Sequence, residues 1–203
     1  LDKRIFNTGT KPFKQKKDLI ITAMIRPSTR RRGAKRTMDL LAYLKNFFSK
    51  KLKIIIFGCL DNDQLFMNLN RNFEYENINI VIREEVSEIL KKASVFFDLS
   101  DYQAFGRTGL ESMACGCIPI LPRKCGCDEY AIDGVNSLLI DTQKWGNSIN
   151  RIINLLENQE KMFKMQKEAI KVSKLYSIEE AAKSELTLLT EEYKIHQLKY
   201  EKI

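Results

Sequence analysis

Residues 98 to 122 decide the fold of this chain, and they read Asp98-Leu-Ser-Asp-Tyr-Gln-Ala-Phe-Gly-Arg-Thr-Gly-Leu-Glu-Ser-Met-Ala-Cys-Gly-Cys-Ile-Pro-Ile-Leu-Pro122. The spacing of Thr108 and Glu111 predicts a capping box, with a helix that begins near Gly109 and ends at Gly116. Short apolar runs on either side, too short for helices, predict two strands. A loop that feeds a helix N-terminus offers free backbone N–H groups and a positive dipole end, so this stretch is suited to bind a phosphate.

Strands and helices are expected to alternate on both sides of this stretch. Continuous apolar runs predict buried parallel strands, and helical spacing predicts helices between them. The expected strands are 18–25, 53–57, 77–82, 95–99, 118–121 and 136–141, and the expected helices are 34–49 and 84–92, followed by a helical tail. The predicted fold class is therefore α/β, a Rossmann-like open and mostly parallel sheet flanked by helices, with a helical C-terminal tail. An apolar stripe that includes Leu186, Leu189 and Tyr193 makes the last helix amphipathic.

Charge and composition narrow the function further. The 203 residues carry a net charge of +8, which favours an anionic partner, although a solvated basic surface gives the same charge. No apolar run approaches the ~20 residues of a membrane span, and the polar N-terminal residues lack the apolar segment of a signal peptide. We therefore expect a cytoplasmic protein whose five cysteines are free thiols.

The central stretch resembles the motif of retaining glycosyltransferases of the GT-B type, the family 4 group. That family carries Glu-x7-Glu, written as Glu-Gly-Phe-Gly followed by Glu-Ala-Met-Ala-x-Gly-x-Pro-Val. Here Gln103-Ala-Phe-Gly106 precedes Glu111-Ser-Met-Ala-Cys-Gly-Cys-Ile-Pro-Ile120, so the second glutamate is Glu111 and a glutamine replaces the first. Weaker matches are residues 1–6, which resemble the family's entry into its C-terminal domain, and residues 123–134, which resemble its Gly-Gly-x-x-Glu segment.

The resemblance implies a function for the whole chain. Residues 1–203 would be the nucleotide-sugar-binding, C-terminal half of a GT-B enzyme whose N-terminal acceptor domain is absent from this chain. With that half, the enzyme would transfer a sugar from a nucleotide diphosphate sugar, with retention, to a glycan or lipid-linked acceptor in bacterial surface polysaccharide synthesis. No cofactor or metal would be required, and the fragment alone would be weakly active or inactive. The last helix would contact the N-terminal domain, and peripheral association with the cytoplasmic face of the inner membrane is compatible with this function.

The resemblance also implies which residues act. Arg26 and Arg31 would hold the donor diphosphate, Gln103 would contact the donor sugar, and Glu111 would bind the ribose, so these four are the expected catalytic group. The remaining donor contacts are expected from the nucleobase neighbour and the glycine loop, namely Arg83, Phe105, Gly106, Arg107 and Thr108. Cations near the β-phosphate would stabilise the charge that develops as the bond to the leaving nucleotide breaks. An exposed basic loop without a ligand is the alternative for the arginines, and a plain capping residue is the alternative for Glu111.

Two further patterns allow other chemistry. Cys115-Gly-Cys117 and Cys125-Gly-Cys127 could supply four thiolates to zinc, but the spacing is unlike that of structural zinc sites, so we expect no metal and a buried apolar role for the first pair. His196 is the single histidine and lies on the stripe of the last helix, which favours packing over catalysis. A degenerate, non-catalytic nucleotide-sugar-binding module is the second hypothesis, and a basic nucleic-acid binder without a recognised motif is the third.

Overall fold

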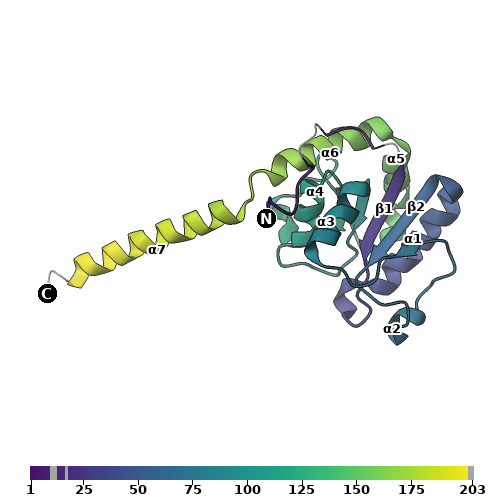
Figure 1. Cartoon of the computed structure of the whole chain (residues 1–203), viewed down its shortest axis with the longest axis horizontal. Helices are drawn as coiled ribbons and strands as arrows, with labels where there is room; N and C mark the ends of the chain where they lie inside the picture. The colour runs from purple at the N-terminus through teal and green to yellow at the C-terminus, as the bar shows by residue number, and fades with distance from the viewer. Residues whose placement is uncertain (10–12, 17, 201–203) are drawn as a thin grey trace.

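The computed structural model describes residues 1–9, 13–16 and 18–200. Its centre is one parallel sheet of six strands in the order β3-β2-β1-β4-β5-β6 (Figure 1). The strands are β1 Leu19–Met24, β2 Leu52–Phe57, β3 Glu76–Asn77, β4 Val95–Phe97, β5 Ile118–Pro122 and β6 Leu138–Ile140. Because strand order reverses beside β1, the carboxyl ends of β1 and β4 lie next to each other, where open α/β sheets bind their ligands.

The apolar runs form the inner strands because both faces of the sheet are covered. Ile21 pairs with Ile54 on one side and with Val95 on the other, and all three side chains are buried. Helix α1 and helix α5 pack on one face, and α3 and α4 pack on the other. The helices are α1 Ala34–Phe48, α2 Gln64–Met67, α3 Arg83–Lys92, α4 Arg107–Ala114, α5 Ile149–Glu157, α6 Gln159–Ser173 and α7 Ile178–Tyr200. The predicted fold class is thereby confirmed.

The third expected strand is the clearest error of the sequence analysis. Only Glu76 and Asn77 pair with β2, and no described residue pairs with the outer side of β3. Asn79 has a φ of 64°, which ends the extended conformation. Ile80 and Ile82 are therefore 69% and 64% exposed, since an edge segment has no second neighbour to bury them.

Helix α7 projects away from the domain (Figure 1). The apolar stripe lies on it as predicted, and Leu186, Leu189 and Tyr193 are exposed. His196 is exposed on the same helix. None of the helices among the described residues has the length and apolar character that a membrane crossing requires.

The expectation of five free thiols is wrong. Cys125 and Cys127 form a disulfide, and Cys59, Cys115 and Cys117 are free and buried. Cys115 and Cys117 belong to the apolar cluster beneath α3, as predicted, whereas the disulfide packs in a different cluster beside Tyr130. The two pairs are therefore not brought together, and no group of three or more metal-ligating side chains occurs in the described part of the chain.

Candidate ligand-binding site

The site is built around the first turn of α4. Gly106 precedes the helix with a φ of 75°, a left-handed conformation that suits glycine. Its carbonyl accepts a hydrogen bond of 2.6 Å from the Tyr130 hydroxyl. A Cβ at Gly106 would lie 2.8 Å from that hydroxyl, and a Cβ at Gly109 would lie 2.6 Å from it. The Tyr130 side chain thus fixes where α4 begins, and both glycines leave room for it.

The predicted capping box does not form. The helix begins at Arg107, two residues earlier than expected, and its N-cap is Gly106, without a side-chain cap. Thr108 lies within the first turn, so its hydroxyl does not cap the helix and Glu111 is not paired with it. Glu111 is instead available to the cavity that runs beside α4.

That first cavity has a volume of about 520 Å³ and lies at the carboxyl ends of β1 and β2. Its lining comes from the N-terminal segment, the two strand ends, the start of α3 and the start of α4: Phe6, Met24, Arg26, Phe57, Gly58, Ile80, Val81, Arg83, Val86, Arg107, Thr108 and Glu111. Only 13% of the Glu111 side chain is exposed. Burial raises the pKa of Glu111, and the positive charges of Arg107 and Arg83 oppose that rise. The cavity therefore combines apolar walls, one partly buried acid and three arginines.

A second cavity of about 450 Å³ lies on the other side of the α4 N-terminus. It is lined by the basic turn after β1, the loop after β4 and the start of α4: Arg31, Arg32, Tyr102, Gln103, Ala104, Phe105, Gly106, Arg107 and Thr108. Arg107 and Thr108 line both cavities, so the two meet at the first turn of α4. Exposed N–H groups there, together with the arginines, suit an anion that spans both.

The structure divides the arginines between the two cavities. Arg26 lines the first and Arg31 the second, with the Arg31 guanidinium 5.6 Å from the centre of the Tyr102 ring. Arg32, which was not among the predicted site residues, also lines the second cavity, and its guanidinium lies 3.8 Å from an Asp98 oxygen. Burial lowers the pKa of Arg32, and the Asp98 charge opposes this. Lys35 is exposed and pairs with Asp39, outside both cavities.

The other predicted positions fall at the site with different surroundings. Arg83 is the first residue of α3, and its guanidinium lies 5.5 Å above the Phe6 ring within the first cavity. Phe105 lines the second cavity but also packs against Tyr130 and Tyr176, at ring distances of 5.3 and 6.0 Å. Gln103 lines that cavity while its side-chain nitrogen bonds Asp98 at 2.7 Å. Asp98 was not predicted as a site residue. Its position directly after a buried strand was the sequence signal that could have placed it near the site.

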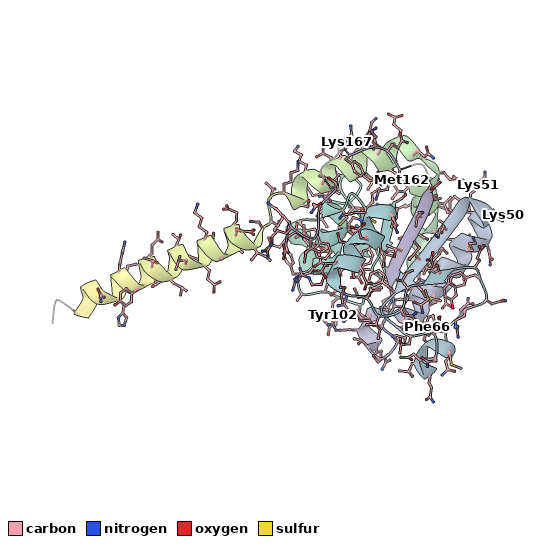
Figure 2. All side chains as sticks on the ribbon, viewed as in Figure 1. Lys50, Lys51, Phe66, Tyr102, Met162 and Lys167 are labelled. Atoms are coloured by element: carbon pink, nitrogen blue, oxygen red, sulfur yellow. A yellow bond between two sulfur atoms is a disulfide. The ribbon has the colours of Figure 1, made fainter. Side chains whose placement is uncertain are left out.

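A larger cavity of about 880 Å³ lies at the amino ends of the strands, on the side of the sheet opposite to the two cavities above. Lys50, Lys51, Lys53 and Met162 are among its lining residues. Figure 2 places the labelled Lys50, Lys51 and Met162 at the far side of the domain from Tyr102. No carboxyl end of a strand and none of the predicted site residues lines this larger cavity.

The chain resembles known proteins both in sequence and in fold. The model of the family described as glycosyl transferases group 1 matches residues 8–172. An uncharacterized glycosyltransferase of Methanocaldococcus jannaschii is 32% identical over 77 residues, which is 38% of this chain and 22% of that protein. Sucrose-phosphate synthase of Thermosynechococcus elongatus has a TM-score of 0.77 at 17% identity, covering 97% of this chain and 51% of that one.

Two further solved structures share the fold. The C-terminal domain of a group 1 glycosyl transferase from Francisella tularensis has a TM-score of 0.68 at 15% identity, covering 86% of this chain and 97% of that domain. HepE of Anabaena, solved with UDP-glucose, has a TM-score of 0.62 at 16% identity, covering 77% of this chain and 44% of that one. This chain thus spans about half, or less, of the longer proteins that it resembles.

Proposed function

This chain belongs to the family of group 1 glycosyl transferases, and on that premise we propose that residues 1–203 form the nucleotide-sugar-binding half of a retaining enzyme of this family. Together with an N-terminal acceptor domain, which α7 would contact, it transfers a sugar to a glycan or lipid-linked acceptor in surface polysaccharide synthesis. The enzyme works in the cytoplasm, at or near the inner face of the membrane. The isolated half binds donor and turns over weakly or not at all.

The observation that carries this proposal is the meeting of two cavities at one helix N-terminus. In our proposal the first cavity takes the nucleoside, with Glu111 accepting hydrogen bonds from ribose hydroxyls and Arg83 beside the base. The second cavity takes the sugar, next to Gln103. The diphosphate lies between them, where Arg107 and Thr108 line both spaces.

The chemistry that these residues supply is electrostatic. When the bond between the sugar and the nucleoside diphosphate breaks, negative charge grows on the β-phosphate. In our proposal this charge develops where the two cavities meet, between Arg26 of the first cavity and Arg31 and Arg32 of the second, at the positive end of the α4 dipole. We propose that these fixed charges stabilise the leaving group and make a metal ion unnecessary. Arg32 therefore joins Arg26 and Arg31 as a proposed phosphate ligand.

The second candidate is a degenerate module that binds a nucleotide sugar without transferring it. It is favoured by Gln103, whose amide is buried and bonded to Asp98, and which carries no negative charge towards the sugar. Both candidates predict donor binding, and only the enzyme predicts turnover when the N-terminal half is present.

The test is a thermal-shift panel with UDP, GDP, dTDP, CDP and ADP. A ligand that binds only the folded state adds RT ln(1 + [L]/Kd) to stability, which is about 2.7 kcal/mol at a hundredfold excess over Kd. We expect one nucleotide to raise the melting temperature and Glu111→Gln to reduce that rise. Glu88→Gln, an exposed position on α3, is the matched control and should leave it unchanged. Equal shifts in both variants would contradict the assignment of Glu111, and no shift with any nucleotide would contradict the binding function.

A further inference from the structure

Asp98 is a buried acid beside the second cavity that does not itself line it. Only 6% of its side chain is exposed. Its Oδ1 accepts hydrogen bonds from the Ser100 backbone N–H, at 3.0 Å, and from the Ser100 hydroxyl. Its Oδ2 accepts a hydrogen bond of 2.7 Å from Gln103 Nε2. A buried carboxylate needs such partners, and every one of these comes from the loop that follows β4.

These bonds determine which way the Gln103 amide faces. A carboxylate only accepts hydrogen bonds, so the Ser100 hydroxyl must donate to Asp98. The hydroxyl oxygen is then free to accept from Gln103 Nε2, which lies 3.0 Å away. Both amide hydrogens of Gln103 are thereby used inside the protein. Its Oε1 forms no hydrogen bond with the described residues, and Gln103 lines the cavity.

We propose that Asp98 is a positioning residue that turns the Gln103 amide so that its carbonyl oxygen faces the donor sugar. The sugar cavity then selects a hexose that places a hydroxyl, which can donate a hydrogen bond, against Oε1 of Gln103. This inference rests on the proposed function, because it assumes that the second cavity receives the sugar of a nucleotide sugar.

The same geometry explains why a glutamine stands at position 103. A glutamate there would bring a second carboxylate oxygen to about the 2.7 Å at which Gln103 Nε2 now meets Asp98, and like charges so close repel. The carboxylate of this pair therefore lies at position 98, where it also approaches Arg32 at 3.8 Å. Position 103 keeps an acceptor for the ligand but gives up its charge.

The substitution Asp98→Asn conserves the side-chain volume and reverses the direction of the hydrogen bond with Gln103. The asparagine amide would donate to Gln103, whose amide would turn over and present N–H groups to the cavity. In the double variant Asp98→Asn/Gln103→Glu, the asparagine would donate to the new carboxylate and an acceptor would face the cavity again. The double variant keeps one acid and one amide at positions 98 and 103, so it should fold even if a single variant does not.

The experiment measures Kd by calorimetry on the full chain for UDP and UDP-glucose, GDP and GDP-mannose, ADP and ADP-glucose, and dTDP and dTDP-glucose. The readout is taken from the pair that binds wild type best. It is the Kd of the nucleoside diphosphate divided by the Kd of its nucleotide sugar, a ratio that isolates the contribution of the sugar. We expect Asp98→Asn to lower this ratio roughly tenfold, the value of about one hydrogen bond. We expect the double variant to restore it to within about threefold, while Kd for the nucleoside diphosphate changes little.

The outcomes separate this inference from the proposed function. If Asp98→Asn leaves the ratio unchanged, or if the wild-type ratio is one for every pair, the positioning role is overturned while diphosphate binding still supports the nucleotide site. If the double variant shows no recovery, Asp98 acts only by holding the loop together and the inference fails. If no nucleoside diphosphate binds at all, the proposed function fails and this inference fails with it.

Discussion

The contact between Tyr130 and the first turn of α4 predicts that Gly109→Ala destabilises the wild type but stabilises the Tyr130→Phe variant. Gly109 is a helical residue, so replacing it with alanine should gain about 1 kcal/mol from helix propensity alone. The new Cβ would, however, lie 2.6 Å from the Tyr130 hydroxyl and 3.0 Å from a methyl of Leu121. Overpacking of this kind costs about 1–3 kcal/mol, so Gly109→Ala should destabilise the wild type by roughly 1 kcal/mol.

Removing the hydroxyl should reverse this result. Tyr130→Phe loses the hydrogen bond to the Gly106 carbonyl, which still accepts from the Gly109 N–H at 2.9 Å, so the single variant should lose about 1 kcal/mol. In that background the remaining close neighbour of the new Cβ is the end of the Leu121 side chain, which can shift. Gly109→Ala should then be stabilising by about 0.5 kcal/mol, a coupling of about 1.5 kcal/mol between the two sites.

Urea unfolding of the four proteins measures this coupling, provided that their m-values agree. Gly146→Ala is the matched control, because its Cβ would meet no atom within 4 Å, and it should show no coupling to Tyr130→Phe. Distant, independent sites add within about 0.3–0.5 kcal/mol. Additivity within that limit at Gly109 would refute the argument that the Tyr130 hydroxyl requires a glycine there.

Three other perturbations have expected outcomes. Burial raises the folded-state pKa of Glu111 above its unfolded value, so the folded state loses stability as pH rises through the carboxyl range. Glu111→Gln should therefore unfold at a higher urea concentration than wild type at pH 7. This difference in urea midpoint should close below pH 4.5, the ordinary pKa of a glutamate side chain. A difference that widens in acid would contradict this sign. The buried hydroxyl of Thr22 has no hydrogen-bond partner among the described residues, so Thr22→Val should stabilise the chain by about 1 kcal/mol in urea unfolding, whereas Thr37→Val, which removes a hydroxyl bonded at 2.9 Å, should destabilise it by a similar amount. Dithiothreitol should open the Cys125–Cys127 disulfide and lower the free energy of unfolding by at most about 1.6 kcal/mol, because the closed loop is short. A variant with serine at both positions should have the same free energy of unfolding with and without reductant.

Much of the fold follows from local sequence patterns. The expected inner strands and the helices α1 and α3 begin and end within a few residues of their observed bounds, because continuous apolar runs and helical spacing are properties of neighbouring residues. The glycine loop, the helix after it and the end of that helix near Gly116 were predicted for the same reason. The arginines and Glu111 were placed in one region by family resemblance, and the structure brings them to two adjoining cavities.

What the sequence determined by itself is therefore most of the strands and helices of the sheet, their order, and the glycine loop that leads into a helix N-terminus. Only the tertiary structure decided that the strand expected at 77–82 is reduced to a two-residue edge strand, Glu76–Asn77, since that depends on having no outer neighbour. It also decided that Tyr130 packs against Gly106, and that Asp98 lies between Gln103 and Arg32. The contacts of Tyr130 with Gly106 and of Arg32 with Asp98 join segments far apart in the chain. Their partners are set by strand order and by the packing of loops at one sheet edge, which local periodicity does not encode.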